Sequence, residues 1–435
     1  MEDLEKELNS RIEYVTELAK QIPFYAKKSE ELGINLNKIK CSEDLLRAYE
    51  KGFCVTKEDF PKLITNLNGF RHIYLTSGTT GKSAIVETTN DDMERCRRQC
   101  QRGYSAFLSK SDAVLNCFPS PPVISGDASK AGATPFPIKM FHAPAQTLRD
   151  ADSFLNHYNM FRFNVIFGLT TSLYRLPFRL SEKGIRAESL KIKGMMTAAE
   201  PSTVERRKKI SEDFGGANVF DWYASTENLV IGYERNSFSN EYEVTLPETL
   251  MFLTNGNEEV KEGKIGNVVI TNLYRNGESP GMILLNYNIG DSAKCLKKNG
   301  DIVTHITDIR RESAYLSGAK MNPIEVEKII ESKIKIGCPE LTGEYTLINY
   351  HSSENRKAIL EVRVVVLPTT SPERRESICK EIENELFLAN TEVYIAVKEM
   401  NDASVLVRAL DEKDLNKGFE NLIKPGKPKR LLVIN

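Results

Sequence analysis

The sequence predicts an α/β protein with a large N-terminal domain and a small C-terminal α+β domain. Short apolar runs alternate with amphipathic helical patterns from about residue 70 to residue 300. Antiparallel strand patterns with glycine turns take over between residues 242 and 305, and an order of helix, two strands and helix follows residue 308. We therefore expect mixed sheets and a β-barrel-like subdomain within the large domain.

The first fifty residues predict helices, because Leu, Glu and Lys recur at helical spacing with a break at Pro23. The segment "MEDLEKELNS" is acidic, so we expect no signal peptide. No apolar run is long enough for a membrane span. The formal net charge of -1 offers no electrostatic reason for a nucleic-acid or membrane partner. These features predict a cytoplasmic protein that binds neither.

The middle of the chain carries the elements of a largely parallel sheet. The candidate strands are "RHIYLTS", "DAVLNCF", "NVIFGL", "LKIKGMM" and "NVFDWY". The candidate helices are "NDDMERCRRQCQRGYSAFL", "TSLYRLPFRLSEKG" and "PSTVERRKKISEDFG", each with a polar start. Strands that alternate with helices of this length are typical of parallel sheets.

The last third of the chain changes pattern twice. Residues 242–305 contain "EGKIGNVVITNLY", "GMILLNYNIGD" and "NGDIVTHIT", which predict antiparallel strands. Beyond residue 308 we expect the helix "NPIEVEKIIESKI", two strands within "EYTLINYHSSENRKAILEVRVVVL", the helix "SPERRESICKEIENELF" and the strand "TEVYIAV". The charged run "DIRRE" separates the two patterns, so we place the domains at residues 1–307 and 308–435.

The eight cysteines are scattered, and only Cys96 and Cys100 are close in sequence. Their spacing puts both on one face of a helix, but no further Cys or His lies near enough in sequence to complete a metal site. Reduced thiols are the favoured interpretation over a zinc site.

The stretch "YLTSGTTGKS" (residues 74–83) combines glycines, hydroxyls and a lysine, as a phosphate-binding loop does. Only Thr79 and Thr80 separate its two glycines, which is shorter than the spacing of a P-loop. We expect a strand before the loop and a helix after it, within "AIVETTNDDMERC". A P-loop NTPase or kinase remains a rival interpretation, weakened by the spacing and by the lack of a clear acidic strand.

Together with "DWYASTE" (221–227), this loop resembles that of the adenylate-forming enzymes, the superfamily of acyl-CoA synthetases and adenylation domains. The details look most like the phenylacetate–CoA ligase branch. "IPFY" (22–25), "TAAEPST" (197–203), "YNIGD" (287–291), "SGAKMNPIEVE" (317–327) and "GKPKRLLVIN" follow in the order of that family. The resemblance covers essentially the whole chain, and it implies a mobile C-terminal lid domain.

The resemblance implies a role for each motif in binding ATP. Thr76, Ser77, Gly78, Thr79, Thr80, Gly81 and Lys82 would grip the β- and γ-phosphates. Ala199, Glu200 and Pro201 would form a wall of the adenine pocket, Tyr223 would stack on adenine, and Asp221 would accept a hydrogen bond from its amine. Trp222, Ala224 and Ser225 complete this nucleotide-binding run. Thr226 would contact the α-phosphate, Glu227 would hold Mg²⁺, and Asp291 would accept both ribose hydroxyls.

The implied reaction has two steps. A carboxylate attacks the α-phosphate of ATP and displaces pyrophosphate, and a thiol then attacks the acyl adenylate. Lys427 in "KPGKPKRL" matches the catalytic lysine of the family, with Lys424 and Lys429 as alternatives, and would stabilise the charge that develops at phosphorus. A solvated basic tail is the other interpretation of this segment.

The hinge between the domains departs from the family pattern. A Gly-Arg pair is expected there, but the chain has Asp308-Ile309-Arg310-Arg311-Glu312. Arg310 or Arg311 could serve from a shifted register, and Arg310 is our candidate for the nucleotide. A charged linker without such a role is the alternative, and the departure puts the thioester step in question.

The acyl pocket is expected between "LNCFPSPPVISGDASKAGATPF" and "GMMTAAE". Its candidate walls are Phe118, Pro119, Met195, Met196 and Ala198, although Met and Phe at such positions are as often core residues. The predicted function is activation of a small aromatic or hydrophobic carboxylic acid, with ATP, Mg²⁺, and coenzyme A or the phosphopantetheine of a carrier protein. A homodimer is common in this branch. The alternative is a protein of this family that lacks the thioester step and binds an acyl-AMP or a partner.

Overall fold

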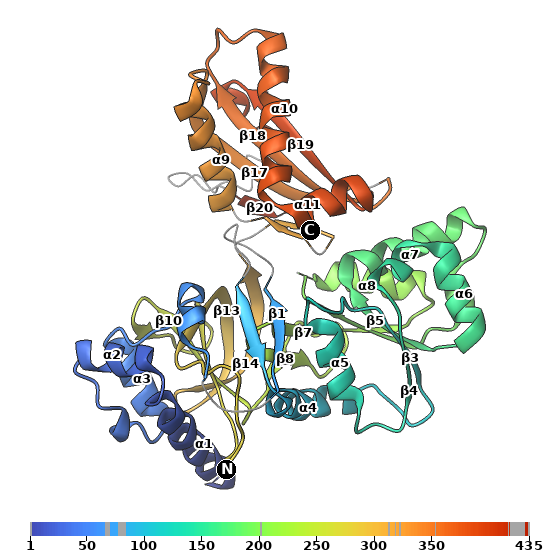
Figure 1. Cartoon of the computed structure of the whole chain (residues 1–435). Coiled ribbons are helices and arrows are strands. Elements are labelled where there is room, and N and C mark those ends of the chain that lie inside the picture. Colours follow the sequence, from blue (N-terminus) through green and yellow to red (C-terminus); the bar gives the residue numbers. More distant parts are fainter. Residues whose placement is uncertain are drawn as a thin grey trace. The chain divides into compact units, whose positions relative to one another are not determined.

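The computed structural model of the chain describes residues 2–65, 70–76, 84–200, 202–311, 314–317, 319–321, 323–352, 354–415, 417 and 431–433. The chain forms two compact units (Figure 1). The first contains Met1–Thr76, Ala84–Thr170 and Ile185–Arg311, and the second contains Thr171–Gly184 and Glu312–Asn435.

The described part of the first unit contains a mixed sheet of 12 strands. In spatial order these are β11 (Glu258–Glu259), β10 (Thr249–Asn255), β12 (Ile265–Asn272), β13 (Tyr287–Asn299), β14 (Ile302–Arg311), β9 (Tyr242–Val244), β8 (Leu229–Glu234), β7 (Asn218–Ser225), β6 (Gly194–Ala198), β5 (Val165–Leu169), β3 (Ala113–Asn116) and β4 (Lys139–His142). The strands from β7 to β4 are parallel, and the rest pair antiparallel. The predicted mixed α/β architecture is confirmed.

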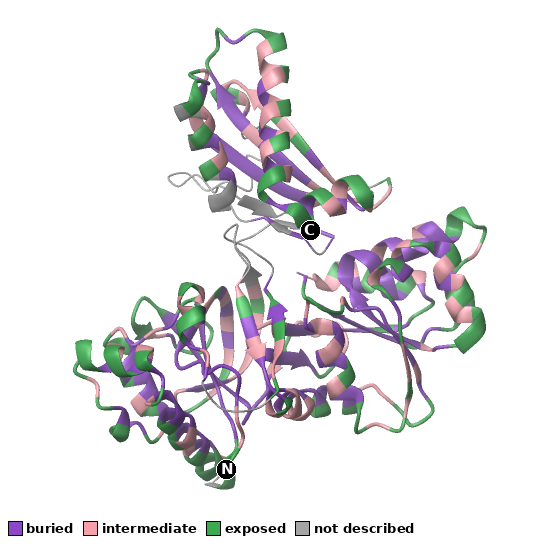
Figure 2. Ribbon diagram, viewed as in Figure 1, coloured by how far each residue is buried: buried purple, intermediate pink, exposed green. Residues whose placement is uncertain are grey.

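Amphipathic helices alternate along the chain with the strands of the parallel half of the sheet. They are α4 (Asn90–Ser105), α5 (Ser125–Ala133), α6 (Ala151–Phe161) and α8 (Val204–Asp213). Thr89 caps α4 by accepting the Asp92 N–H, which satisfies one of the unpaired donors of the first turn. Every residue of β5 and β6 is buried, as expected for strands that are covered on both faces (Figure 2).

The antiparallel half is strongly curved, since β10 also contacts β14, which is not its neighbour in the sheet. Helices α1 (Glu2–Ala19), α2 (Pro23–Glu31) and α3 (Ser42–Glu50) contribute side chains to the hydrophobic core of this half. The short helices of the chain are η1 (Leu36–Lys38), η2 (Lys57–Lys62), η3 (Ala145–Arg149), η4 (Ala187–Leu190), η5 (Ile395–Glu399) and η6 (Glu412–Asp414).

A separate hairpin of β1 (His72–Leu75) and β2 (Ile85–Thr88) flanks the phosphate-loop motif. The expectation of a helix directly after the motif is therefore wrong at its start. Ile85 pairs with Leu75 in an antiparallel register, and α4 begins only at Asn90. The β-branched residues Ile85, Val86 and Thr88 favour the strand. The segments on either side of the loop are thus held together by strand pairing between β1 and β2.

The described part of the second unit has a sheet in the order β19 (Ala403–Leu410), β18 (Ala358–Val366), β17 (Leu341–His351) and β20 (Leu431–Val433). Its other elements are α7 (Thr170–Glu182), the pair β15 (Ala314–Leu316) and β16 (Ala319–Met321), α9 (Pro323–Ile336), α10 (Pro372–Ala389) and α11 (Thr391–Tyr394). The predicted helix, two strands and helix beyond residue 308 are present.

The segment "TEVYIAV", which we predicted as a strand, is helical. It forms α11 and the start of η5. The Asn390 side chain accepts a hydrogen bond from the Val393 N–H at 3.1 Å and so caps the helix. Val393 and Ala396 are buried three residues apart, which is helical spacing. The cap and the tertiary packing prevail over the β propensity of the letters.

β14 runs through Arg311, beyond the predicted border at residues 307 and 308. The assignment of separate nucleotide-binding and lid roles to the two domains stays a prediction. Within the residues that the structure describes, every helix is too short or too polar to cross a membrane.

Candidate active site

The motif "DWYASTE" occupies the end of β7 and the turn into β8. Neighbouring residues of a strand point to opposite faces. The Trp222 ring lies in a core cluster, with its centroid 4.7 Å from that of Tyr104. Asp221 lies on the other face of the sheet and bonds to Thr197. Any contact of Trp222 with a nucleotide would therefore come from its backbone.

Tyr223 and Asp291 were predicted from two separate motifs, and the structure brings them together. The Tyr223 hydroxyl donates a hydrogen bond to Asp291 Oδ2 at 2.8 Å. The Tyr223 ring is 1% exposed and belongs to the core beneath β13. Asp291 lies on β13, which is not a neighbour of β7 in the sheet, so this side-chain contact directly links the predicted base and ribose positions.

Glu227 lies in the turn between β7 and β8, where its carboxylate is half-buried. Its Oε1 accepts a hydrogen bond at 2.7 Å from the hydroxyl of Tyr287, the first residue of β13. Burial, followed by the nearby Glu227, raises the pKa of Tyr287 well above its ordinary value, so the hydroxyl remains a donor at neutral pH.

The Glu227 carboxylate fits the Mg²⁺ of a nucleotide, because it is an oxygen ligand with one oxygen, Oε2, outside the contact with Tyr287. Magnesium in nucleotide sites commonly takes one or two carboxylates and completes its shell with phosphate oxygens and water. Among the described residues no group of three or more His, Cys, Asp and Glu side chains could hold a metal by itself.

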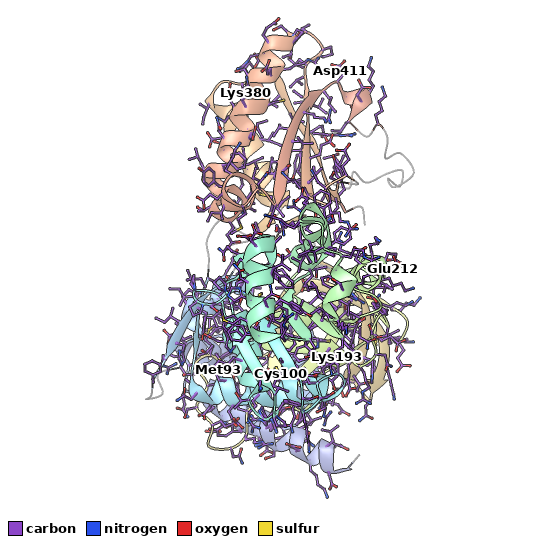
Figure 3. All side chains as sticks on the ribbon, turned by 90° about the vertical axis from the view of Figure 1, so that its right-hand side faces the viewer. Met93, Cys100, Lys193, Glu212, Lys380 and Asp411 are labelled. Atoms are coloured by element: carbon purple, nitrogen blue, oxygen red, sulfur yellow. The ribbon has the colours of Figure 1, made fainter. Side chains whose placement is uncertain are left out.

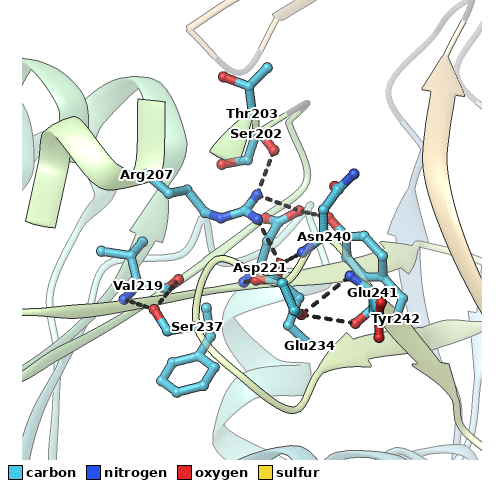
Figure 4. A network of polar contacts seen from close by, with 12 residues as sticks. Ser202, Thr203, Arg207, Val219, Asp221, Glu234, Ser237, Asn240, Glu241 and Tyr242 are labelled. Atoms are coloured by element: carbon cyan, nitrogen blue, oxygen red, sulfur yellow. Dashed lines mark hydrogen bonds and ion pairs between the residues drawn. The ribbon is translucent and has the colours of Figure 1, made fainter. Parts of the chain in front are cut away.

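Asp221 is the centre of a buried polar network (Figure 4). Its Oδ1 accepts a hydrogen bond from the Thr197 hydroxyl at 2.6 Å, and its Oδ2 accepts one from the Tyr242 hydroxyl at 2.7 Å. Its backbone N–H donates to Glu234 at 2.8 Å, and Arg207 lies 3.9 Å from its carboxylate. The carboxylate that was predicted to recognise adenine is therefore fixed from several sides.

Arg207 and Glu234 connect this network to the "TAAEPST" segment. Arg207 donates to Glu234 Oε1 at 2.6 Å and to the carbonyl of Ser202 at 2.5 Å, and the Asn240 N–H donates to the same Glu234 oxygen at 2.7 Å. Burial raises the pKa of Glu234 to about 7, against the lowering effect of Arg207. Ser202 of that segment and Asp221 thus share one support, the pair of Arg207 and Glu234.

Ala199 has a left-handed backbone with φ of 69°, which is costly for a residue with a Cβ atom. The residue is exposed at the end of β6, while Glu200 beside it is buried. Strained residues of this kind often mark binding sites, although strain alone does not establish one. The position agrees with the predicted wall of an adenine pocket, which stays a prediction.

Thr76 ends the β1 side of the hairpin and is buried. Its Oγ1 accepts a hydrogen bond from the Ala84 N–H at 3.0 Å, and its own N–H donates to the Ala84 carbonyl at 2.9 Å. Thr76 therefore closes the base of the loop motif, and its hydroxyl proton is left to donate elsewhere.

Several predicted site residues lie outside the described part of the chain. These are Ser77, Gly78, Thr79, Thr80, Gly81, Lys82, Pro201 and Lys427 with its alternatives Lys424 and Lys429. The backbone of Arg310 lies in β14 and pairs with Ser292, while its side chain is outside the description. Their predicted roles stay predictions.

The predicted acyl walls divide between the two faces of the sheet. Phe118, Met196 and Ala198 belong to one buried cluster, and Pro119 follows Phe118 and is half-buried. Met195 precedes Met196 on β6 and points to the opposite face. The two methionines therefore point to opposite faces of β6, and the predicted roles of the five residues as acyl walls stay predictions.

The two close cysteines lie on α4, where Figure 3 labels Cys100. Both are buried, with Sγ atoms 3.9 Å apart, and all eight cysteines are free thiols.

Sequence reasoning missed the side chains that hold the candidate site residues, namely Tyr242, Arg207 and Glu234, and gave no separate role to Tyr287. Tyr287 opens the quoted motif "YNIGD", so its position carried a signal. Tyr242 lies outside every motif, and only its pairing on β9 with Glu234 of β8 brings it to Asp221.

The sequence matches the family of AMP-binding enzymes over residues 40–273. It is 24% identical to the phenylacetate-coenzyme A ligase of Thermus thermophilus over 394 residues, which cover 83% of this chain and 80% of the relative. It is 21% identical to the phenylacetate-coenzyme A ligase of Pseudomonas putida, over 71% of this chain and 70% of the relative.

Among solved structures, the chain resembles 2-hydroxyisobutyryl-CoA ligase in complex with 2-HIB-AMP and CoA in the thioesterification state. The TM-score is 0.72 at 18% identity, and the match covers 99% of this chain and 90% of that one. It also resembles an amide bond synthetase from Marinactinospora thermotolerans, with a TM-score of 0.52 at 14% identity over 80% of this chain and 69% of the other. At these identities the likeness shows the fold.

Proposed function

Since the chain belongs to the family of AMP-binding enzymes, we propose that it is an AMP-forming acid–thiol ligase. It would join a carboxylic acid to AMP and then pass the acyl group to a thiol. The observation that carries the proposal is the convergence of Asp221, Tyr223, Glu227 and Asp291. These residues come from two distant motifs, and the contact between Tyr223 and Asp291 joins them.

The nucleotide roles follow from the chemistry of these side chains. Asp221 would accept a hydrogen bond from the exocyclic amine of adenine, and Asp291 would accept the two ribose hydroxyls. Tyr223 would stack on the base. Because its ring is 1% exposed, stacking would require neighbouring side chains to move aside when the nucleotide enters. Thr226 would contact the α-phosphate from the turn that also carries Glu227.

In the first step a carboxylate oxygen attacks the α-phosphorus, a new P–O bond forms, and the bond to the β-phosphate breaks. Pyrophosphate leaves with the bonding electrons, held by Thr76 and the residues of the loop motif up to Lys82. Mg²⁺, when bound by Glu227 and the phosphates, would offset their negative charge. Lys427 would stabilise the charge at phosphorus. The acid is ionised at neutral pH, so no general base is required.

In the second step the sulfur of a thiol attacks the acyl carbonyl carbon and a C–S bond forms. The acyl C–O bond to the phosphate breaks, AMP leaves with the bonding electrons, and the thiol proton passes to solvent. Coenzyme A is the favoured acceptor because both curated relatives are named coenzyme A ligases. The phosphopantetheine of a carrier protein is the second acceptor to test. A small aromatic or otherwise hydrophobic acid is the favoured substrate, since the candidate walls Phe118, Met196 and Ala198 are apolar and buried. A homodimer and a cytoplasmic location stay predictions.

The sequence "DIRRE" supports one alternative function. A chain that lacks the thioester step would act as an acyl-AMP-binding or partner-binding protein. In the structure Asp308 has φ of 51° and lies within β14 rather than in a free linker. The two functions differ in whether a thioester product forms.

The test is ATP–pyrophosphate exchange across a panel of carboxylic acids, followed by mass spectrometry with coenzyme A and a carrier protein offered separately. Acid-dependent exchange and an acyl thioester are expected. Folded protein without exchange for any acid would contradict the proposal, and exchange without a thioester would favour the alternative. Lys427→Ala should abolish adenylation with an unchanged melting temperature, and Lys424→Ala and Lys429→Ala are the matched controls.

A further inference from the structure

Three buried tyrosines meet the three carboxylates of the candidate site in the same way. Each tyrosine is at most 3% exposed and donates its hydroxyl to one carboxylate oxygen. The pairs are Tyr223 with Asp291 at 2.8 Å, Tyr242 with Asp221 at 2.7 Å, and Tyr287 with Glu227 at 2.7 Å. The three carboxylates to which the proposed function gives a hydrogen-bonding or metal-binding role, Asp221, Glu227 and Asp291, therefore each have a tyrosine partner.

A tyrosine hydroxyl suits this task because it is neutral. It fixes one oxygen of the carboxylate without cancelling the negative charge, whereas an arginine would pair with the charge and commonly occupy both oxygens. A carboxylate offers about four lone-pair positions. The tyrosine hydroxyl takes one of them, and at Asp221 the Thr197 hydroxyl takes another while Arg207 lies 3.9 Å from the carboxylate. At Glu227 the tyrosine contact involves Oε1 alone.

The tyrosines of these pairs lie on strands, and in the pair of Tyr287 and Glu227 the tyrosine is the member that a strand fixes. Tyr287 opens β13, pairs with Ile270 of β12, and packs its ring 5.2 Å from that of Phe60. Tyr242 lies on β9 between Glu234 of β8 and Ile306 of β14. Glu227, in contrast, sits in a turn. Tyr287 is therefore placed to orient the Glu227 carboxylate, whereas the backbone of Asp221 is itself held in β7 and its carboxylate is oriented by hydrogen bonds such as that of Tyr242.

We propose that Tyr287 and Tyr242 are positioning residues with separate tasks. Tyr287 orients Glu227 toward the metal of the nucleotide, and Tyr242 orients Asp221 toward the base. The inference rests on the proposed function, from which it takes the roles of the two carboxylates. Tyr223 belongs to the same arrangement, but its predicted stacking on adenine makes it unsuitable for a clean test.

The experiment compares Tyr287→Phe with Tyr242→Phe. Both changes keep the ring and remove one hydroxyl that faces a carboxylate. Tyr49→Phe is the matched control, since Tyr49 is equally buried and its hydroxyl bonds to Thr254 at 3.1 Å, away from the motifs. Calorimetry with the full chain gives two ratios. One compares the Kd of ATP without and with Mg²⁺, and the other compares the Kd of inosine triphosphate, which lacks the exocyclic amine, with that of ATP.

Tyr287→Phe should lower the ratio of the Kd of ATP without Mg²⁺ to the Kd with Mg²⁺ by roughly three- to tenfold. It should leave the ratio of the Kd of inosine triphosphate to that of ATP unchanged. Tyr242→Phe should lower the ratio of the Kd of inosine triphosphate to that of ATP and leave the ratio for Mg²⁺ unchanged. Tyr49→Phe should change neither ratio. A merely structural role predicts equal effects on both ratios, or none, and either result overturns the inference.

The failure of the inference and the failure of the function are distinguishable. If the wild-type chain shows acid-dependent exchange while both variants keep wild-type ratios, the inference is wrong and the function stands. If the wild-type chain does not bind ATP at all, the proposed function fails and the inference fails with it.

Discussion

Two regions of the first unit bury carboxylates in opposite ways. Near the N-terminal helices, Glu248 is held by charge, because Arg11 lies 3.3 Å and Arg98 lies 3.0 Å from its Oε1. In the candidate site, Glu227 and Asp291 are held by the neutral hydroxyls of Tyr287 and Tyr223. Asp221 is intermediate, with a tyrosine hydroxyl at 2.7 Å and Arg207 at 3.9 Å.

The difference separates carboxylates that support the fold from carboxylates that are suited to bind a ligand. A buried charge needs a partner, and an arginine supplies one within the fold. A tyrosine hydroxyl holds a carboxylate oxygen without adding a positive charge. The comparison teaches that the type of partner, rather than burial, distinguishes the candidate site.

The largest effect on stability is expected at the charge-paired region. Glu248→Gln should lower the free energy of unfolding by about 2 kcal/mol, because two buried arginines lose a shared negative partner, although Arg11 keeps Glu7 and Arg98 keeps Glu278. Denaturation in urea measures the loss, and the Kd of ATP for the folded variant should stay at the wild-type value. If Glu248→Gln instead weakened ATP binding and left the free energy of unfolding unchanged, the two regions would not differ in the proposed way.

The tyrosine-held region should show the opposite result. Asp291→Asn should weaken ATP binding by roughly tenfold to a hundredfold, because the amide cannot accept both ribose hydroxyls. The Asn oxygen can still accept the Tyr223 hydroxyl, so the urea midpoint should scarcely move. Glu248→Gln is the matched control for loss of one negative charge. A large drop in the urea midpoint of Asp291→Asn would show that Asp291, like Glu248, mainly supports the fold.

The contribution of Glu234, which accepts a hydrogen bond from the Asp221 N–H, to the free energy of unfolding should depend on pH. Burial raises the pKa of Glu234 to about 7 from an ordinary value of 4.5, so the folded state favours its protonated form. The stabilisation from that proton is complete below pH 4.5 and is lost as the pH rises through about 7. We expect the free energy of unfolding of the wild type to fall across this range relative to that of Glu234→Gln. Parallel pH profiles of the two proteins would contradict this assignment.

The smallest effect concerns backbone strain beside the site. Ala199→Gly should raise the free energy of unfolding by about 0.5 kcal/mol, since relief of the left-handed φ is partly offset by the entropy of glycine in the unfolded chain. Arg162→Gly is a control at another left-handed position, the end of α6. If Ala199→Gly lowered the free energy of unfolding, the packing contacts of the Ala199 methyl group would outweigh the strain of its backbone.

Much of the family assignment was accessible from the sequence. The resemblance to adenylate-forming enzymes, and to their phenylacetate–CoA ligase branch, is confirmed by the family match and by the names of both curated relatives. The strands around "NVIFGL" and "NVFDWY" are present because their apolar runs are buried in a parallel sheet. The errors fell where tertiary context prevails, as in the hairpin strand Ile85–Thr88 and the helical segment after Asn390.

The sequence by itself predicted which side chains would carry the chemistry, because the resemblance of "DWYASTE" and "YNIGD" to motifs of the adenylate-forming enzymes singles out Asp221, Glu227 and Asp291. Only the tertiary structure decided what holds them. Tyr223 reaches Asp291 across 68 positions of the chain, and Tyr287 reaches Glu227 across 60. No local spacing encodes such contacts, since they depend on the order of strands in the sheet. That order is set by burial of the whole core, and it places a tyrosine hydroxyl against each of these three carboxylates.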